Sequence, residues 1–441
     1  MAEKKPNIRF KGFEEEWEDK TLGSMGETFS GLSGKSKKDF GHGDAQYITY
    51  MNVFSNPIAS PDGVDKVEID TSQNAVHKGD ILFTTSSETP EEVGMSSVWL
   101  EEKPHTYLNS FCFGYRPIVP LDPHFSAYLM RSPKMRDAFY FLAQGISRFN
   151  ISKQKAMDIE TSIPQETEQR KIGEFFKQLD ELIGAKEQEL EKLRQIKLAL
   201  LDKMFPSDNQ ENINGGGGDK SLIYKMLQNN SQLVVSSPAP NTPTIRFRGF
   251  TEPWVKYPIS HRVTYGKGRG YSKASLQQSG TPILLYGTLY TDYNTNITEV
   301  NRYSAKKDWA VMSKGNEVVV PASGETAEDI ARASAILKAG IILGGDLNII
   351  YPDDNLDASF LALELTYGNS HRKLVKKAQG ISVVHLHNTD ISELEINVPS
   401  YNEQRKIGDF FRSQDEAIAN SRLQINKLKT IKQACLSQMF A

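Results

Sequence analysis

Apolar residues recur at spacings of three and four along residues 168–205 and predict one long amphipathic helix. The stripe consists of Ile172, Phe176, Leu179, Ile183, Leu190, Leu193, Ile196, Leu200 and Met204. No proline lies inside the segment, and Pro164 stands before it, where it ends a strand-like run. At 1.5 Å per residue, such a helix would be about 55 Å long. A helix of that length cannot cover its own apolar stripe, so it needs a partner surface.

The same pattern returns in residues 403–440, after Pro399, and about half of the aligned positions are identical without a gap. Its stripe consists of Ile407, Phe411, Ile418, Ile425, Leu428, Ile431 and Met439. Each copy is the most economical partner for the other, which favours a two-helix coiled coil. The alternative is that both are ordinary core helices, against which their length and polar outer faces speak.

The duplication extends to the globular segment before each helix. A motif with Ile-Arg-Phe, Gly-Phe and Trp occurs in residues 6–17 and 243–254. In the first copy, Phe10, Phe13 and Trp17 are expected to pack this segment onto a domain. Loops bearing glycine and lysine follow at residues 29–43 and 265–275, and strand-like runs at residues 47–55 and 283–291.

Further along, each copy has a turn, an apolar strand and the pattern Ser-x-Glu-Thr, in residues 77–99 and 313–337. Residues 89–92 match a capping box with proline at the first helical position, and residues 326–329 match it more weakly. A helix N-terminus can hold a phosphate. The neighbouring carboxylates disfavour an anion here, so we favour a plain strand-to-helix corner; they are Glu88, Glu91, Glu325 and Glu328.

A helix, the tetrad Gln-Gly-Ile-Ser and an apolar strand complete each copy, with the tetrads at residues 144–147 and 379–382. These elements predict an α+β protein with two duplicated mixed α/β domains and two long helices. The predicted boundaries are residues 1–163 for the first domain, 164–205 for its helix, 206–242 for a linker, 243–398 for the second domain and 399–441 for its helix.

The linker is rich in glycine. Its Gly-Gly-Gly-Gly-Asp-Lys-Ser run resembles a phosphate-binding loop, but Asp219 stands where that loop needs glycine, and no apolar strand precedes it. We therefore interpret the linker as a flexible connector. Leu222, Ile223, Met226 and Leu227 could form one short helix within it.

Composition is that of an ordinary globular protein. The chain has 441 residues, 38% apolar and 24% charged, with a net charge of −3 and two distant cysteines, Cys112 and Cys435. It has no apolar run long enough to span a membrane and no apolar signal region at its start, so we expect a cytoplasmic protein. Because the chain is not basic overall, contact with nucleic acid would depend on local patches or on a partner.

No catalytic or metal-binding pattern emerges from the sequence. It contains no His-Glu-x-x-His, no Cys-x-x-Cys and no Asn-Pro-Pro-Phe/Tyr, the tetrapeptide typical of adenine amino-methyltransferases. Residues 266–270 resemble a dinucleotide loop but lack the strand–loop–helix setting and the acidic residue about twenty positions later. The duplicated architecture therefore favours a binding protein with two recognition domains.

The ordered combination of these motifs resembles the specificity (S) subunit of type I restriction-modification enzymes. The motifs are Gly-Ile-Ser at residues 145–147 and 380–382, the prolines Pro164 and Pro399, and Glu-Gln-Arg-Lys-Ile-Gly at residues 168–173 and 403–408, opening helices that end in Met-Phe. The resemblance covers nearly the whole chain apart from the linker.

The resemblance implies that each domain is a target recognition domain that reads one half of a bipartite, asymmetric double-stranded DNA site. The two helices would pack antiparallel, set the gap between half-sites and dock two modification subunits, which bind S-adenosylmethionine and methylate adenine. Motor/nuclease subunits using ATP and magnesium would complete the enzyme. The chain itself would carry no cofactor and no catalytic activity. Partner contacts are expected at the helix starts, at Gln169, Arg170, Phe176, Gln404, Arg405 and Phe411.

DNA contacts are expected where the copies differ after Gly-Ile-Ser, because arginine suits guanine, and asparagine suits adenine. These candidates are Arg148, Asn150, Lys153 and Lys155 in the first copy and His385, His387 and Asn388 in the second. The phosphate candidates in the glycine- and lysine-bearing loops are Lys35, Lys37, Lys38, Lys267, Arg269 and Lys273. Two rival hypotheses are a helical scaffold without sequence-specific DNA contact and a self-sufficient methyltransferase, which the missing motifs disfavour.

Overall fold

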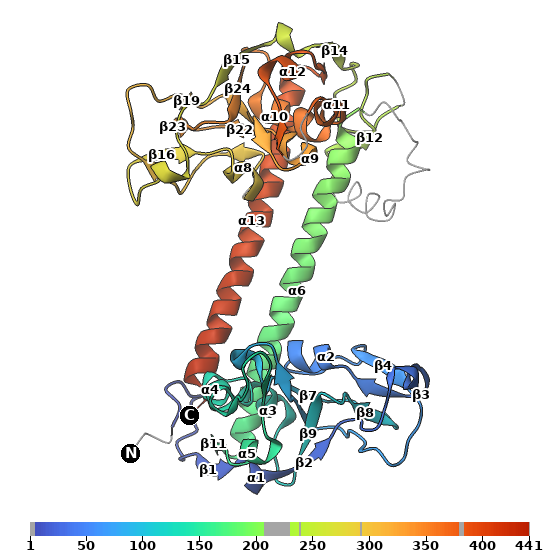
Figure 1. The fold of residues 1–441 in the computed structure, drawn as a ribbon. Coiled ribbons are helices and arrows are strands. Elements are labelled where there is room, and N and C mark those ends of the chain that lie inside the picture. Colours follow the sequence, from blue (N-terminus) through green and yellow to red (C-terminus); the bar gives the residue numbers. More distant parts are fainter. Residues whose placement is uncertain (1–4, 207–229, 238–239, 292, 379–382, 441) are drawn as a thin grey trace. The chain divides into compact units, whose positions relative to one another are not determined.

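The computed structural model describes residues 5–206, 230–237, 240–291, 293–378 and 383–440 (Figure 1). The chain divides into two compact units, unit 1 (Met1–Glu187 and Leu423–Ala441) and unit 2 (Gln188–Arg422). The two predicted long helices are α6 (Glu166–Met204) and α13 (Tyr401–Gln438). Each helix begins in one unit and ends in the other, because the units divide after Glu187 in α6 and after Arg422 in α13. None of the described helices is long and apolar enough to cross a membrane.

Within each unit the two long helices run antiparallel. In unit 1, the Lys432 ammonium of α13 lies 2.7 Å from Asp180 of α6, and Lys429 lies 2.7 Å from Glu187, so residue numbers fall on one helix as they rise on the other. In unit 2, Lys197 of α6 forms an ion pair with Asp415 of α13. The two lysine–aspartate pairs occupy corresponding positions in the two sequence repeats. The prediction of two long, paired antiparallel helices is thus confirmed.

The residues of the two apolar stripes are buried or half-buried, with one exception. Ile172, Phe176 and Ile407 are buried, but the side chain of Ile431 is 50% exposed. Its inclusion in the stripe was wrong, because the seven-residue repeat through Ile418 and Ile425 continues at Lys432. The lysine stem covers the seam there, while the ammonium reaches Asp180.

Unit 1 contains short sheets that are mostly antiparallel. A four-stranded sheet has the order β2 (Gly26–Ser30), β9 (Cys112–Pro117), β5 (Ile81–Thr84), β7 (Ser96–Val98). A three-stranded sheet has the order β4 (Val64–Val67), β3 (Phe40–Ile48), β8 (Thr106–Leu108), in which β3 and β8 run parallel. Two further pairs are β1 (Glu18–Thr21) with β11 (Glu160–Ile163) and β6 (Ser86–Ser87) with β10 (Phe149–Asn150).

Short helices connect these strands. They are α1 (Leu22–Met25), η1 (Lys37–Asp39), α2 (Tyr50–Ser55), η2 (Pro90–Glu92), α3 (Pro123–Leu129), α4 (Pro133–Leu142) and α5 (Lys153–Ala156), where η denotes a 3₁₀ helix.

Unit 2 repeats this plan with larger sheets. A five-stranded sheet has the order β15 (Val263–Lys267), β24 (Leu347–Pro352), β20 (Glu317–Pro321), β22 (Ser334–Ile336), β17 (Asn296–Ile297). A four-stranded sheet has the order β18 (Tyr303–Ser304), β16 (Thr281–Leu284), β23 (Ala339–Leu343), β19 (Met312–Lys314). The pairs are β12 (Leu233–Val235) with β13 (Ile245–Phe247), β14 (Val255–Pro258) with β26 (Glu395–Val398), and β21 (Ser323–Gly324) with β25 (Val384–His385).

The helices of unit 2 are η3 (Ile259–His261), η4 (Lys273–Ser275), α8 (Thr288–Thr291), α9 (Ala327–Ile330), α10 (Ala358–Tyr367), α11 (Asn369–Lys377) and α12 (Asn388–Ser392).

The phenylalanine that ends each sequence repeat packs into a unit core. Phe440, just after α13, stacks on Phe176 in unit 1 with ring centroids 5.7 Å apart. Its counterpart Phe205, just after α6, packs in unit 2 against Trp254 at 6.0 Å and Phe360 at 5.9 Å. Large aromatic rings bury the most apolar area per residue, so these contacts hold the helix ends in place.

The repeated Ile-Arg-Phe motif contributes a buried ion pair in each unit. Arg246 donates through Nε and Nη2 to the two carboxylate oxygens of Glu403, at 2.7 and 2.8 Å, and both side chains are at least 96% buried. Arg9 and Glu168 form the corresponding bidentate pair in unit 1. The packing role of the surrounding aromatics is also confirmed for Trp17, which is 2% exposed against Phe125.

Two predicted strands are wrong beyond their first two residues. The run at residues 47–55 leaves β3 after Ile48 and becomes α2, because the Thr49 hydroxyl accepts a hydrogen bond from the amide of Asn52 and caps a helix. The run at residues 283–291 likewise leaves β16 after Leu284 and ends in α8. Each single helix predicted before the Gly-Ile-Ser motif is two helices, broken at Pro133 in unit 1 and at Gly368 in unit 2.

Of the two predicted capping boxes, the weaker sequence match at residues 326–329 forms the capping bond, and the stronger match at residues 89–92 does not. Thr89 makes no side-chain capping bond, and η2 is a single 3₁₀ turn, because Glu92 accepts from the hydroxyl of Ser87 instead. Thr326 does cap α9 by accepting from the amide of Asp329.

The predicted linker is only partly a connector. Its residues 233–235 form β12 against β13, and Leu233 is buried. The short helix predicted from residues 222–227 lies outside the described residues.

Candidate nucleic-acid interface

In both units the segment after Gly-Ile-Ser pairs with a short strand formed by the first two residues of the Ser-x-Glu-Thr motif. In unit 1, Phe149 and Asn150 of β10 face Ser87 and Ser86 of β6. In unit 2, β25 faces β21 with the same antiparallel register, so that Val384 corresponds to Phe149 and His385 to Asn150. Backbone pairing therefore fixes the position of two segments whose side chains differ between the copies.

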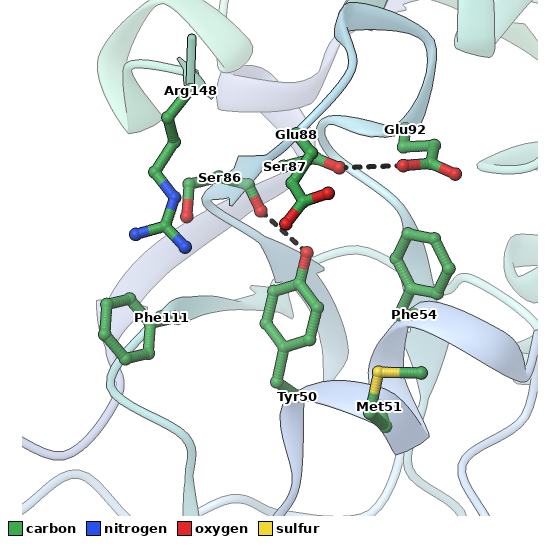
Figure 2. Close-up of a pocket in the computed structure, with 9 residues that line it drawn as sticks. All are labelled: Tyr50, Met51, Phe54, Ser86, Ser87, Glu88, Glu92, Phe111 and Arg148. Carbon is green, nitrogen blue, oxygen red and sulfur yellow. Dashed lines mark hydrogen bonds between the residues drawn. The ribbon is translucent and has the colours of Figure 1, made fainter.

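A pocket opens beside this pair in unit 1 (Figure 2). The residues that line it are Tyr50, Met51, Phe54, Ser86, Ser87, Glu88, Glu92, Phe111 and Arg148. Tyr50 of α2 donates from its hydroxyl to the Ser86 carbonyl oxygen over 2.7 Å, and Ser87 donates to Glu92 over 3.1 Å. These two bonds tie the pocket walls together and engage Glu92.

Arg148 and Glu88 are the charged side chains of this pocket that remain available. Both are exposed, and neither side chain has a hydrogen bond or ion pair with another residue of the described chain. Figure 2 shows both side chains directed toward the hollow above Tyr50 and Phe111. The pocket thus presents one unpaired guanidinium and one unpaired carboxylate beside exposed apolar groups.

Two of the other predicted DNA contacts in unit 1 already touch residues of the protein. Asn150 is exposed, and its amide makes a long 3.5 Å contact with the Arg148 carbonyl oxygen. Lys153 of α5 donates to the Ser30 hydroxyl over 2.7 Å, while Lys155 on the same short helix is exposed. The structure thus brings these four residues into one segment, with Arg148 and Lys155 the most accessible.

Two exposed apolar residues near this segment are not among the candidates predicted from the sequence. Ile146 of the Gly-Ile-Ser motif is 98% exposed, and Phe141 at the end of α4 is 82% exposed. Single exposed apolar residues are common on protein surfaces, and the repeated motif was the only available signal for Ile146.

The phosphate candidates fall into two groups. Lys35 is ion-paired with Asp70 over 2.7 Å, and its hydrogen bond holds the pKa of the Asp70 carboxyl well below the usual value. Lys37 and Lys38 on η1 are exposed. In unit 2, Lys267, Arg269 and Lys273 are exposed on and after β15. Lys35 therefore offers less free charge than the other candidates.

The predicted base contacts of unit 2 also differ in how accessible their side chains are. His385 and His387 are exposed, and their rings stack with centroids 6.4 Å apart. Asn388 instead turns inward and donates to the Gly266 carbonyl oxygen over 2.9 Å. Its predicted role as a base contact does not fit this geometry, because the amide already braces β15 against α12.

Four of the six predicted partner contacts are buried. Gln169 accepts from the Asp122 amide and donates to the Pro164 carbonyl, and Gln404 makes the equivalent bonds to Asp357 and Pro399. Phe176 and Phe411 are fully buried in the unit cores. Their burial removes these four side chains from any surface that a partner could touch.

Arg170 and Arg405, at the starts of α6 and α13, are exposed. Arg170 forms an ion pair with Glu166 one turn earlier on the same helix. The repeated Glu-Gln-Arg motif therefore combines two inward-facing residues with one outward-facing arginine.

Comparison with known proteins assigns the family. The family described as type I restriction modification DNA specificity domain matches residues 14–195 and 251–430, once in each sequence copy. The chain therefore belongs to this family and carries two of its domains.

A putative type I restriction enzyme MjaX specificity subunit from Methanocaldococcus jannaschii is 26% identical over 201 residues. That match spans 43% of this chain and 46% of the relative, so it covers about half the length of either protein.

Two solved structures share the fold over almost the full length. The S subunit of a type I restriction-modification system from M. genitalium gives a TM-score of 0.57 at 14% identity, covering 99% of both chains. A chain from a study of complex assembly and conformational transition of the type I R-M system gives 0.52 at 13% identity, covering 95% of this chain and 96% of the other.

Proposed function

We propose that this chain is the DNA-recognition subunit of a type I restriction-modification complex. Each unit would read one half of a bipartite, asymmetric DNA sequence. The observation that carries this proposal is the pairing of β10 with β6 and of β25 with β21 in one register, with different exposed side chains in the two copies. A common scaffold with different side chains is expected to read different bases, since base edges are read by side chains.

In this proposal the chain carries out no chemical step. Two modification subunits would bind S-adenosylmethionine and methylate adenine, and motor/nuclease subunits would use ATP and magnesium. The exposed Arg170 and Arg405 are our remaining candidates for contacts with these partners. The long helices α6 and α13 would set the gap between the half-sites.

Exchanging unit 2 should change one half of the recognised sequence. We suggest replacing residues 259–394 by the matching segment of a related chain, which leaves the β14–β26 pair intact. The variant is expressed with its modification subunit, and the methylated motif is read by genome sequencing.

The half-site read by unit 1 should persist, while the other half changes. If the sites methylated by the wild-type complex share no two-part motif, the hypothesis of a helical scaffold without sequence-specific DNA contact would be favoured. Methyl transfer by the purified chain alone would contradict its non-catalytic role.

Replacing Lys37 by alanine should weaken binding to specific and random DNA alike. A phosphate contact carries no sequence information, and its loss should reduce the slope of log K against log salt by about one unit. Fluorescence titrations of the complex at several salt concentrations measure this slope.

Lys35→Ala is the matched control, because the Lys35 charge is already compensated by Asp70. The slope should change less in this variant. Equal slopes for wild type and Lys37→Ala would remove Lys37 from the interface.

A further inference from the structure

The carboxylate of Glu88 takes no part in the hydrogen bonds that join the described residues of this pocket. It is exposed, it lines the same pocket as Arg148, and it has no hydrogen-bond or ion-pair partner among the described residues. The other pocket carboxylate, Glu92, accepts from Ser87. An unpaired carboxylate is unfavourable next to DNA phosphates, so its presence at a DNA interface requires a donor on the DNA.

The major-groove edge of a G·C base pair supplies such a donor. Guanine presents the acceptors O6 and N7, and cytosine presents the N4 amino group. A guanidinium suits the guanine edge, and a carboxylate suits the cytosine amino group. Arg148 and Glu88 together therefore match a G·C pair, in which guanine presents two adjacent acceptors for the guanidinium and cytosine presents the donor for the carboxylate. An A·T pair divides its two acceptors between adenine N7 and thymine O4 and carries its donor on adenine, so it offers the guanidinium no such pair of acceptors on one base.

We propose that Arg148 and Glu88 read a single G·C base pair in the half-site of unit 1. This inference rests on the proposed function and deepens it by assigning the base pair. Arg148 donates to guanine, and Glu88 accepts from the paired cytosine. The Tyr50–Ser86 hydrogen bond and the β6–β10 pairing hold the two backbones that carry these side chains.

Unit 2 provides an internal contrast. Val383 occupies the place of Arg148, because it precedes Val384 as Arg148 precedes Phe149 in the aligned ladders. Its side chain is 48% exposed and carries no donor. Unit 2 retains a glutamate, Glu325, at the place of Glu88 but lacks the guanidinium, so this pair of side chains is particular to unit 1.

The test compares Arg148→Ala and Glu88→Ala, each expressed as the full chain with its modification subunit. Genome methylation sequencing gives the motif, and titrations with single-substitution duplexes give the discrimination at each position. Both variants should relax the same base pair in the unit 1 half-site, with discrimination reduced on the order of tenfold. The unit 2 half-site should stay unchanged.

Glu91→Ala is the matched control. It removes the same charge three residues away, and Glu91 does not line the pocket. It should leave the motif unchanged. Glu88→Ala should also bind random DNA no more weakly than wild type, since it removes a repulsive charge.

Relaxation at different base pairs, or an unchanged motif in Glu88→Ala, would overturn the inference while leaving the proposed function intact. Weaker assembly with the modification subunit at an unchanged motif would also overturn it, by making the pocket a protein contact. Absence of a two-part motif in the wild type would instead overturn the proposed function. Circular dichroism of both variants and a Glu88→Asp variant, which retains the acceptor, separate these outcomes from misfolding.

Discussion

Replacing Glu403 by alanine is expected to destabilise unit 2 by about 3–5 kcal/mol. The variant leaves Arg246 with an unpaired charge in a site where the arginine is 4% exposed. A buried charge without a partner is much more costly than an exposed one. Hydrogen exchange measures the effect, with the amides of β14 and β26 as reporters and those of unit 1 as the internal reference.

Removing both partners should be far less harmful. Arg246→Met combined with Glu403→Leu replaces the ion pair by apolar side chains and leaves no buried charge. Glu168→Ala in unit 1 should cost less than Glu403→Ala, because Arg9 is 13% exposed and can reach water. A loss below about 1 kcal/mol for Glu403→Ala would contradict the buried-charge explanation.

Inserting four residues into each long helix is expected to lengthen the unread gap in the recognised DNA by about one to two base pairs. The insertions would follow Glu187 in α6 and Arg422 in α13, where the two units divide. Four helical residues add about 6 Å and turn the helix about 40° past a full turn. One base pair adds about 3.4 Å and about 35°. The shift and the rotation of one recognition domain relative to the other are therefore both close to those produced by one or two additional base pairs.

The methylated motif of the lengthened protein, expressed with its modification subunit, measures the gap. Both half-site sequences should persist. An insertion into α6 alone makes the two helices unequal and should abolish methylation at every motif. An active, doubly lengthened protein with the original gap would show that the helices do not set it.

The long helices were predictable because their signal is long and repeated. An apolar period sustained over about ten turns cannot be mistaken for a strand. The six residues of α2 offered no such length, and their apolar content matches a strand equally well. What decided between the two was the Thr49 capping bond, a local interaction that a strand-length pattern does not reveal.

The site was harder to predict because sequence repetition does not distinguish structural from functional residues. Gln169 and Gln404 recur in both copies because each satisfies buried backbone groups of its own unit. Asn388 has a residue type suited to bases but braces the backbone at Gly266. In the sequence, Glu88 is only a charge that repels phosphate, whereas the fold places its unpaired carboxylate in the same pocket as Arg148.

The two lysine–aspartate pairs have a consequence for how such proteins diversify. If α13 slid along α6 by one heptad, Lys432 would lose Asp180 and Lys197 would lose Asp415. Slippage is therefore penalised at two places at once. Under the proposed function, a descendant with a new gap would need matched gains or losses in residues 181–196 and 416–431, between these anchors. Tandem duplication within those stretches would be the genetic route, because it preserves both anchors while changing the distance between them.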